Sequence, residues 1–368
     1  MKRRHWLGMM CGTALWPMLP SRLLAAAPAF PTVMPRPLVF PRDHGAHPEF
    51  RTEWWYLTGW LESPARETFG FQITFFRART AHDPANPSRF APHQLLFAHA
   101  ALSRPRIGHL LHDQRAARMI RGDSAVAFSA SDADLRLADW HLRRRPDGVY
   151  EAQIDAKTFI FDLRFTPTQP LLLQGEGGYS RKGARPEQAS HYYSLPQLSA
   201  AGTVVQERER LAVGGRAWLD HEWSSKVLDA AAAGWDWVGI NLDDGGALMA
   251  FRIRPRTGET NLWATARWRD RDGNERSFGP DETSFEPMAY WLSPRTGTRY
   301  PVRCRLTLGS GAEALHFEIE PLMEDQELDA RRSTGAVYWE GAVMLLAEGK
   351  RRGRGYLELV GYHRPMRL

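Results

Sequence analysis

Short runs of alternating apolar and polar residues recur along this chain and predict β-strands. In the clearest run Phe69, Phe71, Ile73 and Phe75 alternate with small or polar residues, the period of two of a strand with one buried face. Similar short strands are predicted at 95–102, 148–154, 158–165, 247–253, 261–268, 315–319 and 356–362. Helical spacing is scarce, and residues 224–233 are its best candidate. The pattern therefore predicts an all-β protein.

Turn residues separate these runs. Residues 243–246 read Asp-Asp-Gly-Gly, and 146–148 and 271–274 also contain Asp-Gly. Asp-Gly and Gly-Gly supply the positive φ of tight hairpins, so neighbouring strands should be antiparallel. Meandering strands of this kind form barrels or sandwiches, and closing a barrel removes exposed edges. An eight-stranded barrel has room for its own side chains or one small apolar ligand.

A weak internal repeat suggests two such units. Residues 54–62 align without gaps with residues 235–243, and each copy continues into an alternating run that ends in arginine. Chance similarity between two aromatic strands is the alternative. A chain of 368 residues is long for one core. We predict a signal peptide at 1–27, one β domain at 28–223 and a second at 224–368.

The first 27 residues have the order of a secretory signal peptide. Lys2, Arg3 and Arg4 precede an apolar stretch at 6–19, and small residues follow at 25–27. The apolar stretch is too short for a stable membrane span. We therefore expect cleavage near Ala27 and a periplasmic or secreted protein. Arg3 and Arg4 also loosely match a twin-arginine signal, so the Sec and Tat routes both stay open.

Charge and cysteine content narrow the function classes. The net charge is +6, and four basic residues of the leader account for most of it, which leaves +2. With no basic stripe in the remainder, nucleic-acid binding is not expected. Cys304 is the only cysteine beyond the leader, which excludes an intramolecular disulfide and a multi-cysteine metal site. The histidine spacings match no zinc motif, and no nucleotide loop is present. We predict neither a metal nor a cofactor.

Ordered motifs over residues 40–365 resemble the carotenoid 1,2-hydratase/AttH family. The opening motif is residues 47–59, His-Pro-Glu-Phe-Arg-Thr-Glu-Trp-Trp-Tyr-Leu-Thr-Gly. The others, in order, are residues 70–77, 97–103, 191–194, 218–223, 338–341 and 355–362. The resemblance implies two tandem lipocalin-like antiparallel barrels, in agreement with the repeat.

Family resemblance leaves the activity open, because one fold hosts enzymes and binders. Some members resemble hydratases of isolated double bonds in carotenoids, secreted fungal members hydrate a prenyl group, and the AttH branch is associated with an ABC export system. Carotenoid synthesis proceeds from the cytoplasmic side, so a cleaved leader argues against that role. We expect an exported protein that binds a lipid or isoprenoid-like ligand, as an accessory of ABC transporter subunits or in peripheral contact with the membrane. The alternative is a hydratase of an apolar alkene.

Hydration of an unactivated alkene needs a strong acid, an apolar pocket that tolerates a carbocation, and a base that directs water. The segments 220–223 and 235–237 assemble such residues, and the predicted catalytic set is Asp220, His221, Trp223 and Asp236. In the resemblance, His221 and Trp223 match a His-x-Trp pair. No clear Tyr-x-Asp follows, because Gly234 stands two positions before Asp236.

Structural roles are the competing interpretation of these residues. Asp220 and His221 could form a buried hydrogen-bonded pair at the junction of the barrels, since buried polar groups need partners in any case. Glu53 could equally form a salt bridge with Arg51 or Arg77. The tryptophans are candidates for the core as much as for a cation cradle. The aromatic residues predicted to bind the ligand are Trp54, Trp55, Tyr56, Tyr192, Trp235 and Trp237.

Overall fold

The computed structural model describes residues 30–366 apart from residues 84, 85, 87, 89, 90, 121–124 and 259. The predicted signal peptide and Cys11 lie outside the described residues. In the described part, the only helices are four short 3-10 turns, η1 (Arg42–His44), η2 (Pro105–Ile107), η3 (Pro280–Glu282) and η4 (Gly311–Glu313). None of the described helices is long and apolar enough to span a bilayer. The all-β prediction is confirmed.

The first sheet contains the strands up to Ser224. Its strands are β1 (Thr52–Glu62), β2 (Thr68–Arg79), β3 (Gln94–Ser103), β4 (Leu111–Arg118), β5 (Val126–Phe128), β6 (Asp134–Leu137), β7 (Trp140–Arg144), β8 (Tyr150–Asp155), β9 (Phe159–Thr166), β10 (Leu172–Leu173), β11 (Tyr179–Arg181), β12 (Ala189–Gln206) and β13 (Glu209–Ser224). They pair antiparallel in the order β4-β3-β2-β1-β13-β12-β9-β8-β7-β6-β5, with β10 and β11 on β12. The sheet curls until β3 and β4 approach β6.

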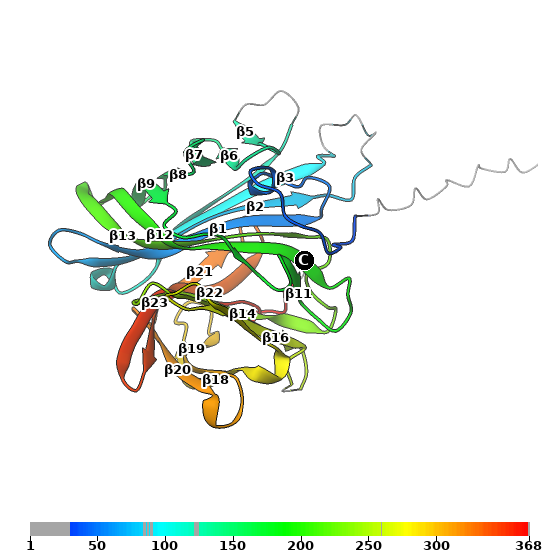
Figure 1. Cartoon of the computed structure of the whole chain (residues 1–368). Coiled ribbons are helices and arrows are strands. Elements are labelled where there is room, and N and C mark those ends of the chain that lie inside the picture. Colours follow the sequence, from blue (N-terminus) through cyan, green and yellow to red (C-terminus); the bar gives the residue numbers. More distant parts are fainter. Residues whose placement is uncertain are drawn as a thin grey trace, which may run out of the picture.

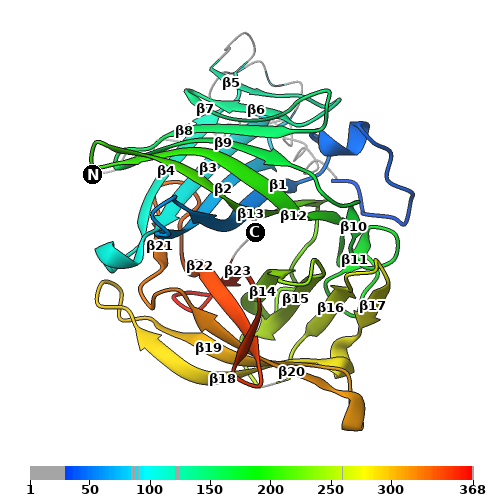
Figure 2. The ribbon, with the colours of Figure 1, turned by 60° about the vertical axis from the view of Figure 1, so that its left-hand side comes forward.

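The second sheet contains the rest of the chain. Its strands are β14 (Ala232–Leu242), β15 (Ala247–Pro255), β16 (Trp263–Arg269), β17 (Glu275–Phe278), β18 (Thr283–Leu292), β19 (Arg299–Leu308), β20 (Leu315–Pro321), β21 (Glu327–Ala330), β22 (Ala336–Ala347) and β23 (Lys350–Leu359). The order is β17-β16-β15-β14-β23-β22-β20-β19-β18, with β21 on β22. The two sheets, a barrel and a half-barrel, stack face to face (Figures 1 and 2).

Apolar residues cluster inside each sheet and between the two sheets. One core fills the interior of the first sheet and includes Phe71, Ile73 and Phe75. A second core lies inside the second sheet. A third cluster lies between the sheets and contains aromatic residues of both, including Tyr56 and Trp237. Since side chains alternate between the faces of a strand, each central strand contributes to its own core and to this shared seam.

The internal repeat corresponds to equivalent strands. β1 lies between β2 and β13, and β14 lies between β15 and β23. In the alignment Trp54 matches Trp235 and Tyr56 matches Trp237, and all four side chains face the seam between the sheets. Tyr56 and Trp237, at matching positions of the repeat, contact each other edge to face across the seam, with ring centroids 5.3 Å apart.

The segment 224–233, the best helical candidate, does not form a helix. β13 continues to Ser224 and β14 begins at Ala232, with a loop between them. Ser224 Oγ accepts a hydrogen bond from the Lys226 amide, and Asp229 Oδ1 accepts one from the Ala231 amide. Such side-chain acceptors compete with helical hydrogen bonding. The strands before this loop belong to the first sheet and those after it to the second. Whether the chain folds as two separate domains with a boundary at 223/224 stays a prediction.

Candidate functional site

A cavity of about 420 Å³ lies in the seam between the two sheets. Trp54 and Tyr56 of β1 line it from the first sheet, and Trp235 and Trp237 of β14 line it from the second. We call it the seam cavity. Its remaining wall is largely apolar or aromatic and includes Phe76, Leu95, Phe97, Val227, Leu228, Phe251, Ile253, Ala336 and Val360. A concave apolar space with a few polar groups is the usual form of a small-molecule site.

Two glutamates share the wall that the second sheet contributes. Glu340 of β22 and Glu358 of β23 are direct cross-strand partners, so their side chains lie on the same face. Glu340 is buried, and Glu358 keeps part of its surface open within the cavity that it lines. Among the described residues neither forms an ion pair, and neither oxygen of Glu340 accepts a well-formed hydrogen bond, although the hydroxyls of Tyr56 and Tyr338 lie near it. Glu358 Oε2 accepts a hydrogen bond of 2.7 Å from Trp235 Nε1.

This placement keeps protons on the pair. Burial, and then the charge of Glu358, raise the pKa of Glu340 well above its ordinary value, and the hydroxyls of Tyr56 and Tyr338 only partly oppose the rise. Burial raises the pKa of Glu358 to about 7. Two carboxyls this close in an apolar site cannot both ionise cheaply. At neutral pH the seam cavity therefore contains at least one neutral carboxylic acid.

His99 of β3 fixes one tyrosine beside the pair. Ser333 Oγ donates to Gln114, so His99 Nε2–H donates to Ser333 over 2.8 Å. His99 Nδ1 is then the acceptor for the Tyr338 hydroxyl, also at 2.8 Å. Burial lowers the pKa of His99 to about 3, in agreement with a neutral ring. The Tyr338 hydroxyl is thus directed at the first sheet and leaves Glu340 without a strong donor.

Asp220 of β13 faces the cavity from the first sheet. Its carboxyl accepts hydrogen bonds from the Tyr192 hydroxyl at 2.7 Å, Ser194 Oγ at 2.5 Å and Trp218 Nε1 at 2.7 Å. Trp237 Nε1 from the second sheet donates to the Tyr192 hydroxyl at 3.0 Å. Burial raises the pKa of Asp220 to about 7 although the three donors lower it. Asp220 can therefore give or take a proton near neutral pH.

A buried ion pair completes the polar part of the cavity. Lys182, one residue after β11, places Nζ 2.9 Å from Glu222 Oε1. The ammonium also lies over the rings of Tyr192 and Phe251, at 4.6 and 4.1 Å from their centroids. Burial lowers the pKa of Lys182, and the charge of Glu222 opposes that effect.

The predicted site residues separate according to strand alternation. Asp220 and five of the six predicted ligand-binding aromatics, Trp54, Tyr56, Tyr192, Trp235 and Trp237, line the seam cavity. Trp55, His221 and Trp223 face the interior of the first sheet. Asp236 faces the interior of the second sheet, where Arg252 and Arg254 bind it at 2.7 and 2.9 Å. The segment 220–223 therefore supplies two different sites, one on each face of β13.

The interior site of β13 is a closed network around Glu53. Glu53 Oε1 accepts from His47 Nδ1 at 2.7 Å and from His221 Nε2 at 2.9 Å, and Oε2 accepts from Arg77 Nε at 2.8 Å. His47 stacks on Trp223 with ring centroids 3.7 Å apart. His221 Nδ1 lies 3.1 Å from the Tyr193 hydroxyl. The salt bridge between Glu53 and Arg77 that was open in the sequence is thus present.

The charges of this network are mutually compensated. Burial raises the pKa of Glu53, but the hydrogen bonds from His221 and His47 and the charge of Arg77 outweigh it and hold that pKa well below its usual range. Burial lowers the pKa of His47, but Asp43 and Glu53 outweigh it and raise the pKa. The ligand atoms of His47, Glu53 and His221 lie within 4.8 Å of one another, which is close enough to hold a metal ion. Arg77 and the imidazolium of His47 already neutralise Glu53, which is the pattern of an ion-pair network.

Sequence reasoning assigned no role to the cavity residues Lys182, Glu222, Glu340 and Glu358. A signal for the glutamates was present, since Glu340 follows Tyr338 by two positions and Glu358 follows Tyr356 by two in motifs already noted. The period of two places each glutamate on the same strand face as its tyrosine. That these two faces meet could not be read from the motifs, because strand pairing was unknown.

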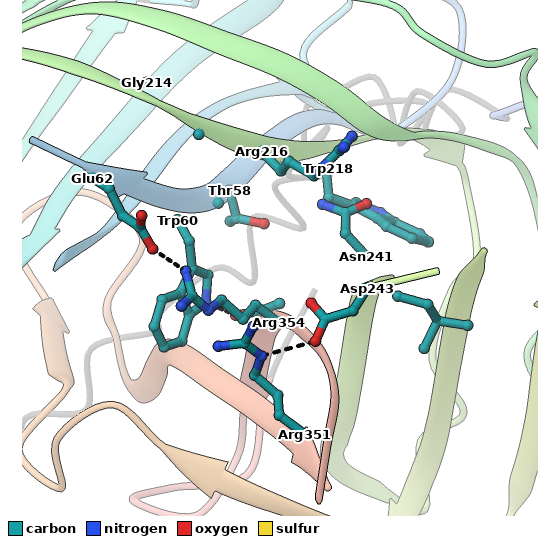
Figure 3. A pocket seen from close by; sticks show the side chains of 14 residues that line it. Thr58, Trp60, Glu62, Gly214, Arg216, Trp218, Asn241, Asp243, Arg351 and Arg354 are labelled. Carbon is teal, nitrogen blue, oxygen red and sulfur yellow. Dashed lines mark hydrogen bonds and ion pairs between the residues drawn. The ribbon is translucent and has the colours of Figure 1, made fainter. Parts of the chain in front are cut away.

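A second hollow, of about 500 Å³, lies at the other end of the seam (Figure 3). Arg351 and Arg354 pair here with Asp243 and Glu62, partly exposed to solvent. Trp218 lines this hollow while its Nε1 binds Asp220, so it stands between the hollow and the seam cavity. Exposed ion pairs of this kind contribute about 0–1 kcal/mol each. The unpaired acids lie in the seam cavity, which is the candidate site.

Comparison with known proteins agrees with this architecture. A family model described as AttH-like matches residues 31–362. The solved structure of an AttH of Nitrosomonas europaea is 50% identical, covers 90% of this chain and 99% of its own, and superposes with a TM-score of 0.84. No curated protein matches the chain.

Two more distant structures share the fold. Kievitone hydratase from Nectria haematococca is 14% identical, with 90% of this chain and 94% of its own covered and a TM-score of 0.65. CghA with Sch210972 is 13% identical, with 84% and 88% covered and a TM-score of 0.52. At 14% and 13% identity these structures share the fold with this chain, and the high coverage means that the similarity includes both sheets.

Proposed function

We propose that this chain, which belongs to the AttH-like family, binds an apolar unsaturated molecule in the seam cavity and adds water to an isolated carbon–carbon double bond. The observation that carries the proposal is the cross-strand pair of Glu340 and Glu358, which line an aromatic cavity and form no ion pair with any described residue. Such a pair is a reservoir of protons at neutral pH. The proposal assumes that the seam cavity binds an apolar ligand, and it assigns proton transfer to the carboxyls that line the cavity.

The reaction divides into two proton transfers and one attack by water. A neutral carboxyl of the pair donates its proton to one alkene carbon, and the π electrons form the new C–H bond. The neighbouring carbon becomes cationic, and aromatic faces such as Trp54, Trp235 and Phe251 can stabilise that charge. Water bonds to the cation through oxygen and loses one proton to a carboxylate. Alkene and water are consumed, and an alcohol is formed.

Asp220 is the proposed acceptor of the water proton. Its three hydrogen-bond donors hold the carboxyl in one orientation, and its pKa of about 7 allows it to exchange a proton without a large free-energy change. The roles of His221, Trp223 and Asp236 in catalysis receive no support from this geometry, because their side chains face the interiors of the sheets. In this proposal they stabilise the two sheets that form the cavity.

The fold neighbours are compatible with this class of reaction. Kievitone hydratase is named for a hydration, and it shares the two-sheet fold with this chain. That likeness does not specify the substrate. The apolar walls indicate a hydrocarbon or prenyl-like group, and the identity of the natural substrate is left to experiment.

Deuterium incorporation tests the proposal. The purified protein is incubated in D₂O with acyclic isoprenoid alkenes such as myrcene, geraniol and squalene, and mass spectrometry follows both deuterium uptake and addition of water. We expect deuterated alcohol from the wild type and a rate lower by about 10²–10⁴ for Glu340→Gln and Glu358→Gln. Wild-type protein that binds these alkenes without forming deuterated product would refute hydration.

A carrier without chemistry is the second candidate, and the signal peptide predicted at residues 1–27 would favour it. In this alternative the protein is exported, holds a lipid or isoprenoid-like ligand in the periplasm and serves an ABC export system. N-terminal sequencing of the exported protein tests the first step and should begin near Ala27 or Pro28. Native mass spectrometry of protein from the periplasm would then identify a retained apolar ligand, and Glu340→Gln would retain it equally well.

A further inference from the structure

Lys182 is an amine enclosed in the seam cavity. Its side chain is 5% exposed, and Nζ lies 2.9 Å from Glu222 Oε1 and 3.2 Å from Ser180 Oγ. The rings of Tyr192 and Phe251 cover two further directions. Both Lys182 and Glu222 line the cavity, so a bound ligand meets the amine and its carboxylate partner together.

A lysine at position 182 is informative because most basic residues of this chain are arginines. Its basic residues number 48, and the lysines are Lys2, Lys157, Lys182, Lys226 and Lys350. Lys157, Lys226 and Lys350 are exposed, so Lys182 is the buried lysine of the described residues. An arginine would pair with Glu222 but could not lose its proton, whereas a lysine can. Among the described residues that line the cavity, Lys182 therefore supplies the primary amine.

We propose that Lys182 captures an apolar aldehyde or ketone in the seam cavity as a protonated imine, with Glu222 as proton shuttle and counter-ion. Burial, which lowers the pKa of Lys182, supports the free-amine form that the reaction needs. The aromatic walls select the apolar part of the ligand. This inference rests on the proposed function only in taking the seam cavity as the ligand site.

The charges of the existing ion pair balance the chemistry. The ammonium of Lys182 gives one proton to the Glu222 carboxylate, and the free amine then attacks the carbonyl carbon. A proton moves from nitrogen to oxygen within the resulting carbinolamine. The Glu222 carboxyl next protonates the hydroxyl, which leaves as water while the C=N bond forms. The iminium cation then stands beside the Glu222 carboxylate where the ammonium stood, so the cavity gains no net charge.

Reductive trapping tests this inference on the full-length folded protein. The probe is decanal with sodium cyanoborohydride, which converts an imine into a stable secondary amine. Peptide mapping by mass spectrometry then compares alkylation of Lys182 with that of the exposed Lys226 in the same sample. Lys182→Arg is the matched variant, because it keeps the positive charge beside Glu222. Decanol, which has no carbonyl, is the control ligand.

We expect one decyl group per protein at Lys182, formed at least about tenfold faster than at Lys226, because the cavity holds the aldehyde beside an amine whose pKa is lowered by burial. Lys182→Arg should lose this fast phase and keep the slow labelling of Lys226. Glu222→Gln should slow only the reaction at Lys182, by about 10²-fold or more. Labelling of Lys182 no faster than that of Lys226 in the wild type overturns the inference, whether or not Lys182→Arg folds.

The two proposals fail separately. If decanal is trapped at Lys182 and myrcene takes up no deuterium, imine formation stands and hydration does not. If myrcene is hydrated and Lys182 is not labelled preferentially, hydration stands and the covalent step is wrong.

Discussion

Glu340 and Glu358 stand directly opposite each other on β22 and β23, and both line the cavity between the sheets. Like charges at cross-strand positions are destabilising, and burial makes the repulsion stronger. A fold that holds this pair without an ion-pair partner among the described residues must keep at least one of the two carboxyls protonated at neutral pH. This single relationship sets the electrostatics of the candidate site and leads to the first prediction.

Stability should fall as pH rises through the window in which this pair is protonated only in the folded state. The unfolded glutamates lose their protons near the ordinary pKa of 4.5, whereas burial raises the pKa of Glu358 to about 7 and that of Glu340 well above its ordinary value. The folded state then binds more protons than the unfolded state, so the free energy of unfolding decreases with pH. His47, whose pKa is also raised, adds to the same trend.

Thermal melting of wild type, Glu340→Gln and Glu358→Gln between pH 5 and 8 isolates the pair. We expect the wild type to lose melting temperature across this range relative to both variants, because glutamine cannot ionise. Parallel curves for the three proteins would show that the pair is not protonated in the folded state.

Breaking the network around Glu53 should be far more costly than breaking a surface pair on the same strand. Glu53→Gln leaves Arg77 buried without its carboxylate, which costs about 3–5 kcal/mol of unfolding free energy. Glu62→Gln, at the other end of β1, removes an exposed partner of Arg354 and should cost about 1 kcal/mol or less. Urea denaturation measures both. Equal losses would show that the network contributes no more than a surface ion pair.

Neighbouring positions on β13 should separate stability from activity. His221→Ala removes a buried partner of Glu53 and of Tyr193 and should cost about 1–3 kcal/mol. Any surviving folded protein should keep its ligand affinity, since His221 does not line the cavity. Asp220→Asn should instead reduce formation of the deuterated alcohol, because Asp220 is the proposed acceptor of the water proton. If His221→Ala melts like the wild type while abolishing hydration, His221 is catalytic and this assignment is wrong.

Ligand affinity should depend on the cavity tryptophans. Trp54 is half-buried and faces the cavity, so Trp54→Ala should weaken binding of an apolar fluorescent probe such as N-phenyl-1-naphthylamine by up to about tenfold. Trp291→Ala, on β18 and outside the cavity lining, is the control and should leave the affinity unchanged. Equal affinities for the two variants would place the probe elsewhere.

The sequence alone determined the fold class. Alternation in the run from Phe69 to Phe75 and the Asp-Gly turns predicted antiparallel strands, and the alignment of Trp54 with Trp235 anticipated two equivalent strands. The same alternation explains why Asp220 was a sound candidate for the cavity and why its neighbour His221 is not there. A sequence pattern separates the two faces of a strand without saying what each face meets.

Tertiary structure alone decided which of those faces form the site. Glu340 and Glu358 become a pair because β22 and β23 align in one register, and Lys182 meets Glu222 because β11 folds back on β12. Pairing and register depend on contacts between residues far apart in the chain, which local periodicity does not contain. The helical expectation for 224–233 failed because Ser224 and Asp229 accept local backbone amides there and because β13 and β14 take up the two ends of the segment. Burial between the two packed sheets shifts the pKa values of Asp220, Glu340, Glu358 and Lys182, and the proposed reactions depend on these shifts.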